Sequence, residues 1–115
     1  MSIELNQQEC CEHYGAQYLP VKTGQLVTIS KGIYEGVNPV EGVRYPSPEH
    51  MSGWWLTTDE YDGNIDSLVT VHFQHIIEKR PELALYMALP FGYRFNLGGE
   101  TEHVWLDQEV AQESI

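Results

Sequence analysis

The chain has 115 residues, of which 42% are hydrophobic and 11% aromatic, so it can fold around a core without disulfides or metal. Seventeen acidic residues against six Lys and Arg give a net charge of −11, which excludes nucleic acid as an expected ligand. No segment approaches the roughly 18 apolar residues of a membrane helix, and the N-terminus lacks a secretion signal. We therefore expect a cytoplasmic protein without a membrane partner.

The acidic charge has two interpretations. It can guide the protein toward a basic protein surface, because complementary charge raises association rates more reliably than it raises affinity. It can also do no more than keep the protein soluble. The charge alone does not decide between them.

The N-terminal half of the chain predicts three strands. Residues 1–19 are polar and lack clear periodicity, so they form either an arm or a short helix. The β-branched run at residues 26–30 is the first strand, and the Pro- and Gly-rich stretch after it leaves room for a short strand around residues 43–45. The third strand, at residues 54–58, runs into an acidic loop rich in turn-forming residues.

Residues 65–80 follow two patterns at once. Val69, Val71 and Phe73 alternate as in a strand, whereas a longer set of positions follows helical spacing. Because the longer set has more matches, we predict a helix here, with Asp66 as its N-cap and basic residues in its last turn. The helical set consists of Ile65, Leu68, Val69, His72, Phe73, Ile76 and Ile77.

The C-terminal third predicts a second helix and a hairpin. Pro81 ends the first helix and begins a shorter one over residues 81–88, where its missing N–H is harmless. Residues 91–97 and 103–106 form the two strands of the hairpin, and residues 107–115 form an acidic tail.

These elements predict an α+β protein. Strands, a helical pair and further strands, joined by short connections, favour an antiparallel sheet of about four to six strands with two consecutive helices packed on one face. The length is that of one domain, and we expect residues 1–115 to form it.

One spacing suggests a metal site. His72, His75 and Glu78 lie three apart, so on a helix they would share a face and could hold a metal together. The ordinary alternative is that His72, which falls on the apolar stripe, is a hydrogen-bonded core residue. The adjacent Cys10 and Cys11 are closer than disulfide geometry prefers, and two sulfurs do not complete a tetrahedral metal site.

Other chemistry is not indicated. A calcium loop that started at Asp62 would place its required Gly on Ser67 and its bidentate Glu on Phe73. The sequence contains no phosphate-binding glycine loop and no nucleophile motif. We therefore expect no catalytic residues, no cofactor and no enzyme activity.

The acidic loop and a tryptophan beside it form the predicted partner-binding site. Trp54 and Trp55 point to opposite sides of their strand, and Trp54 shares its side with Leu56, so we place Trp54 in the core. Trp55 then lies either under a helix or exposed as an interface anchor. The predicted contact residues are Trp55, Asp59, Glu60, Tyr61 and Asp62.

Several short motifs resemble a bacterial domain long described as of unknown function and now grouped, as immunity family thirty-three, with the immunity proteins of polymorphic toxins. The resemblance spans about residues 25–97 and offers framework positions, with no active-site residues to carry over. The motifs are Ile29-Ser30-Lys31 with Gly36, Val43-Arg44-Tyr45, Ser52-Gly53-Trp54, Thr58-Asp59-Glu60 and Leu89-Pro90-Phe91-Gly92-Tyr93-Arg94-Phe95.

The resemblance implies a cytoplasmic protein that binds and blocks a toxin. Our first hypothesis is therefore an immunity-type protein, a monomer or homodimer, whose acidic loop meets a basic surface on its cognate protein toxin. The alternative is a small metal- or ligand-binding accessory domain that uses His72, His75 and Glu78.

Overall fold

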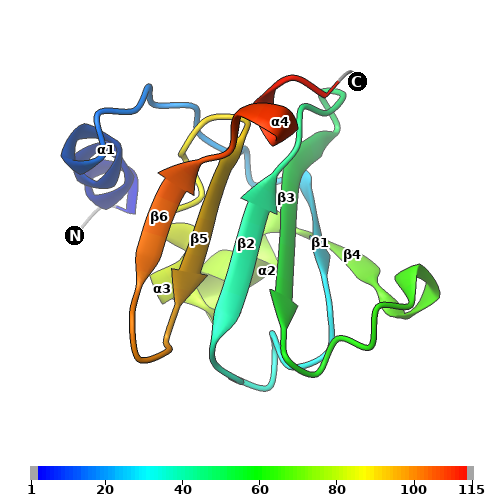
Figure 1. Ribbon diagram of the computed structural model, residues 1–115. Coiled ribbons are helices and arrows are strands. Elements are labelled where there is room, and N and C mark those ends of the chain that lie inside the picture. Colours follow the sequence, from blue (N-terminus) through cyan, green and yellow to red (C-terminus); the bar gives the residue numbers. More distant parts are fainter. Residues whose placement is uncertain (1–2, 114–115) are drawn as a thin grey trace.

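The computed structural model describes residues 3–113 and contains six strands, four α-helices and one short 3-10 helix, η1 (Figure 1). In chain order these are α1 (Ile3–His13), β1 (Leu26–Ile29), β2 (Val40–Arg44), β3 (Met51–Thr58), η1 (Ile65–Ser67), β4 (Val69–His72), α2 (Phe73–Lys79), α3 (Pro81–Ala84), β5 (Tyr93–Leu97), β6 (His103–Leu106) and α4 (Gln108–Ala111).

All six strands form one sheet in the order β4-β1-β3-β2-β5-β6. The pair β1 and β3 is parallel, and the other four neighbouring pairs are antiparallel. The consecutive helices α2 and α3 lie against one face of this sheet, and α4 sits at its upper end in Figure 1. The α+β class, the mostly antiparallel sheet and the two consecutive helices on one face are thus confirmed.

The predicted helix over residues 65–80 is wrong in its first half. Asn64, not Asp66, caps η1, and the chain then forms β4, which pairs antiparallel with the outer side of β1. Ile65 and Val69 of the expected apolar stripe are 67% and 55% exposed, so helical spacing does not bury them. A strand prevails because the edge of β1 supplies backbone partners, which no pattern within the segment itself reveals.

Other boundaries differ less from the expectation. The segment 1–19 contains the short helix α1, whose Gln7 amide donates to the carbonyl of Ala84 at 2.9 Å. The tail contains α4, whose first N–H groups donate to the side chain of Asp107. Residues 114 and 115 of the predicted tail and residues 1 and 2 of the predicted arm lie outside the described residues.

The core lies between the sheet and the helices, and Trp54 is at its centre. This side chain is fully buried, its Nε1–H donates to the Met87 carbonyl at 2.8 Å, and its ring packs on Phe95. Gly42 makes room for Phe95, because a Cβ at that position would overlap the phenyl ring. The inward placement of Trp54 is confirmed.

Arg44 is a buried cation that ties separate segments together. It is 2% exposed, and its guanidinium donates to the carbonyls of Ser52 (2.8 Å), Leu19 (2.6 Å) and Leu89 (2.8 Å). Burial lowers the pKa of Arg44 to about 10, so the group remains charged at neutral pH. None of the ion pairs among residues 3–113 includes it. Carbonyl dipoles therefore compensate this charge, and the motif around Arg44 belongs to the framework of the fold.

Candidate protein-binding surface

One face of the sheet carries α2 and α3, whereas the opposite face carries only the short helix α4 (Gln108–Ala111), which lies at its upper end in Figure 1. Strand side chains alternate between the two faces, and the buried positions Val27, Trp54 and Phe95 identify the face that packs on the helices. The opposite set forms what we name the open face: Leu26, Thr28, Glu41, Val43, Trp55, Thr57, Thr70, His72, Arg94, Asn96, His103 and Trp105.

Strand register arranges the open face in rows. One row crosses all six strands through residues that are direct partners, and it contains two tryptophans. A second row, of polar residues, runs beside it across four strands. The first row is Thr70, Thr28, Trp55, Val43, Arg94 and Trp105, and the second is Thr57, Glu41, Asn96 and His103.

Trp55 lies on this open face and not under a helix. It is half-buried, because its ring packs edge-on against Tyr45 with the ring centroids 5.8 Å apart. Trp105, at the β6 end of the row, packs against His103 with the ring centroids 4.6 Å apart. Sequence reasoning missed Trp105 and His103 as surface candidates, although the alternation of His103 and Trp105 with the apolar Val104 and Leu106 could have revealed them.

Three loops meet at one end of the sheet and form an acidic edge. They join β1 to β2, β3 to β4 and β5 to β6, and the strand directions bring all three to the same end (Figure 1). Residues 30–39, 59–68 and 98–102 together contain seven acids and one lysine. The acids of this edge, all exposed, are Glu35, Asp59, Glu60, Asp62, Asp66, Glu100 and Glu102.

Most of this negative charge is uncompensated. The three ion pairs found among residues 3–113 involve no acid of the edge. Some carboxylates accept backbone hydrogen bonds instead: Glu35 from Gly32 N at 2.7 Å and Glu102 from Gly98 N at 3.2 Å. These bonds order the loops while leaving the charge in place, so the edge presents a strongly negative field to any approaching molecule.

The predicted loop residues belong to the second of these three loops, which joins β3 to β4. Asp59 and Glu60 are exposed, and Tyr61 is half-buried, with its backbone N–H donating to the Thr58 carbonyl at 3.0 Å. Asp62 accepts a hydrogen bond from Asn64 N at 2.9 Å. The loop directly continues β3, whereas Trp55 lies three residues before the end of that strand, on the open face.

The structure does not support the proposed metal site. His72 belongs to β4 while His75 and Glu78 belong to α2, so the three do not share one helical face, and the two imidazole centroids are 6.1 Å apart. Within the described residues, no group of three His, Cys, Asp or Glu side chains could hold a metal ion. His72 is also exposed, which overturns the alternative core placement.

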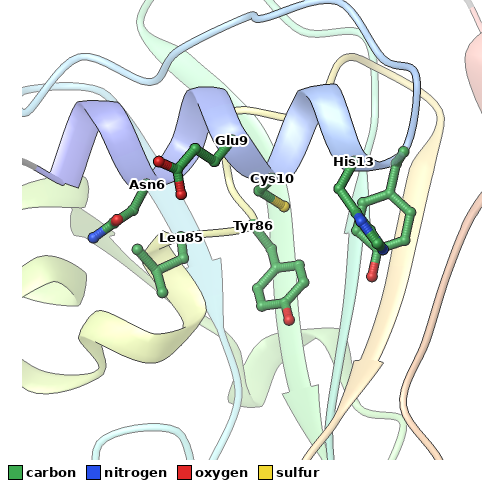
Figure 2. Close-up of a pocket in the computed structure, with 7 residues that line it drawn as sticks. Asn6, Glu9, Cys10, His13, Leu85 and Tyr86 are labelled. Carbon is green, nitrogen blue, oxygen red and sulfur yellow. The ribbon is translucent and has the colours of Figure 1, made fainter.

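A pocket of about 630 Å³ lies elsewhere, between α1 and the segment that follows α3 (Figure 2). Among the residues that line this pocket is Cys10, whose free thiol is the side chain to consider as a nucleophile. Burial, and to a smaller extent the neighbouring Cys11, raise the pKa of Cys10 to about 11. The thiol is therefore protonated at neutral pH, which is the opposite of what a catalytic cysteine requires.

The fold thus defines a class: a small α+β protein with an open sheet face, an acidic edge and an unactivated thiol. Among the described residues, no helix combines the length and apolar character needed to span a bilayer. The family model described as Imm33-like domain matches residues 6–107, and the chain belongs to this family. No curated protein and no solved structure matches the chain.

Proposed function

We propose that this chain is an immunity protein that neutralises a bacterial protein toxin by binding it, without catalysis of its own. Membership of the Imm33-like family supports a toxin as the partner in general. The acidic edge is the observation that carries the mode of action, because it offers a basic toxin surface a concentrated complementary field. The proposal places the encounter in the cytoplasm.

The contact residues proposed are those of the loop after β3 together with its neighbouring tryptophan. Asp59, Glu60 and Asp62 supply charge, and Trp55 and Tyr61 supply aromatic area of the kind that dominates protein interfaces. The loop is exposed, ordered by its own turn hydrogen bonds and bordered by further acids, so it can meet a rigid partner without large rearrangement.

Neutralisation is tested by expressing this chain together with the toxin encoded in the neighbouring reading frame. Growth should be restored by the wild-type chain and lost again in a variant that combines Asp59→Lys, Glu60→Lys and Asp62→Asn. Asparagine keeps the side-chain oxygen that accepts from Asn64 N, so the loop should retain its turn.

The matched control raises the net charge equally at exposed sites away from the acidic edge, with Glu9→Lys, Glu12→Lys and Glu78→Gln. This control should still protect. Failure of the wild-type chain to protect against that toxin would contradict the function, whereas equal protection by both variants would contradict the choice of contact residues.

A further inference from the structure

The open face is a second surface that borders the acidic edge, on which Thr28 is buried and the other side chains are half-buried or exposed. Its composition is unusual for a face that meets only water. A solvated sheet face normally alternates to polar residues. Here the central row instead places Trp55 and Val43 side by side, with Trp105 two strands beyond. Aromatic residues with one side exposed are enriched at the centres of protein interfaces.

The charges on this face are arranged as in an interface with a neutral centre and a charged border. Arg94 in the central row is paired with Asp107, with Nε 2.9 Å from Oδ2, and therefore presents no free cation. Glu41, in the row next to the acidic edge, is exposed and makes none of the ion pairs seen among residues 3–113. Negative charge thus increases from the tryptophan row toward the edge.

We propose that the open face and the acidic edge form one continuous docking surface for a protein partner that has an apolar patch bordered by Lys and Arg. This proposal rests on the proposed function and specifies which side of the molecule meets the toxin. A second copy of this chain is a poor occupant, because two molecules with a net charge of −11 repel each other. Nucleic acid is repelled for the same reason.

Area explains why both parts of the surface are needed. Six strands spaced by about 4.8 Å and about five residues long at 3.3 Å each give a flat face of roughly 400 Å². A stable protein complex buries about 800 Å² on each partner. The sheet face alone is therefore smaller than a typical interface, and the loops of the acidic edge are placed to extend it.

The test compares one charge reversal on the two sides of the sheet. Glu41→Lys lies on the open face, and Glu78→Lys lies on α2, which covers the opposite face; both side chains are exposed and the charge change is identical. The probe is the purified toxin domain from the neighbouring reading frame, and affinity is measured by calorimetry at two salt concentrations. Glu41→Lys should weaken binding at least tenfold and reduce its salt dependence, and Glu78→Lys should change affinity less than twofold.

Trp105→Ala provides an uncharged arm of the same test. As the removal of an interface anchor, it should weaken binding about thirtyfold. Thermal unfolding verifies that each variant is folded. If the Trp105→Ala variant is unstable, Thr57→Arg replaces it, because this substitution adds bulk and positive charge in the row beside the acidic edge.

Three outcomes overturn the proposal in different ways. If the wild-type chain binds the toxin but Glu41→Lys and Glu78→Lys behave alike, the docking face is wrong and the proposed function stands. If the wild-type chain does not bind the toxin at all, both fall. If light scattering shows that the free protein is a dimer that Glu41→Lys dissociates, the face belongs to a second copy of this chain.

Discussion

Substitution of Gly53 tests how tightly the backbone is packed next to Trp54 and Trp55 in β3. It adopts a φ of +89°, in the half of conformational space that L side chains rarely occupy, and a Cβ there would overlap the backbone carbonyl oxygen of Tyr45. Gly53→Ala should therefore destabilise the protein twice over, through the backbone and through the overlap. Gly63 has a similar φ of +84° but no atom within 4 Å of its Cβ position, so Gly63→Ala is the matched control.

The magnitudes follow from these two environments. Forcing an L residue into a positive φ costs about 1–2 kcal/mol, and both variants lose this amount. The overlap with a backbone atom, which cannot rotate away, adds about 1–3 kcal/mol to Gly53→Ala alone. At about 4 °C of melting temperature per kcal/mol, we expect a loss of about 8–20 °C for Gly53→Ala and about 4–8 °C for Gly63→Ala.

Thermal unfolding gives the melting temperatures of both variants and the wild-type chain, and urea unfolding followed by tryptophan fluorescence gives their free energies of unfolding. Alanine restricts the unfolded chain equally at the two positions, so the difference between the variants isolates the overlap. The slope of the transition should be unchanged, which shows that the unfolded states are comparable. Equal losses of stability in the two variants would refute the packing described around Tyr45.

Three further predictions concern other parts of the structure. Arg44→Met should lower the free energy of unfolding by roughly 3 kcal/mol in urea denaturation, because three carbonyl oxygens, two of them in buried hydrogen bonds, lose their donor, and removing a buried cation offsets only part of that cost. Cys10 in the native protein should react with iodoacetamide at pH 8 about a hundredfold more slowly than a thiol of pKa 9.0, because a pKa of about 11 reduces its thiolate fraction by that factor. Mass spectrometry of the native and the urea-unfolded protein measures the ratio of the two reaction rates. Calorimetric titration with Zn²⁺ should give no stoichiometric heat, and the heat should be the same when His72 and His75 are both replaced by Ala.

The strands that could be predicted are those whose signal is local. The β-branched run of β1 and the aromatic residues of β3 are bounded by turn residues, so each is visible within its own segment. The strand β4 also has a local signal, the alternation of Val69, Val71 and Phe73, but helical spacing matches more positions in the same segment. What makes β4 a strand is its pairing with β1, which lies some 40 residues earlier in the chain. Counting apolar positions then favoured the wrong periodicity.

The helix α1 illustrates a different limit. Its buried side includes Gln7, which is 3% exposed and whose amide donates to Ala84 of α3. A polar residue on the packed face removes the apolar stripe by which a helix is recognised. The sequence therefore left residues 1–19 as either an arm or a helix, and the partner that makes Gln7 a core residue lies 77 positions away.

The candidate surface was visible in part. The loop after β3 concentrates acids in sequence, so Asp59, Glu60 and Asp62 could be chosen without a structure. Glu35 and Glu102 join the same edge only because strand directions bring three loops to one end of the sheet. Trp105 joins Trp55 in one row only through the pairing of β6 with β5 and of β5 with β2. The order and direction of the strands, which the sequence composition does not reveal, bring these residues together on one surface.

The salt dependence of binding tests the central claim most directly. The purified wild-type chain is titrated with the toxin domain from the neighbouring reading frame at increasing NaCl concentrations, and the dissociation constant is recorded at each. We predict a one-to-one complex whose affinity falls steadily as salt screens the acidic edge. An affinity that does not change with salt, or the absence of a complex at low salt, would contradict electrostatic recognition of a basic toxin surface.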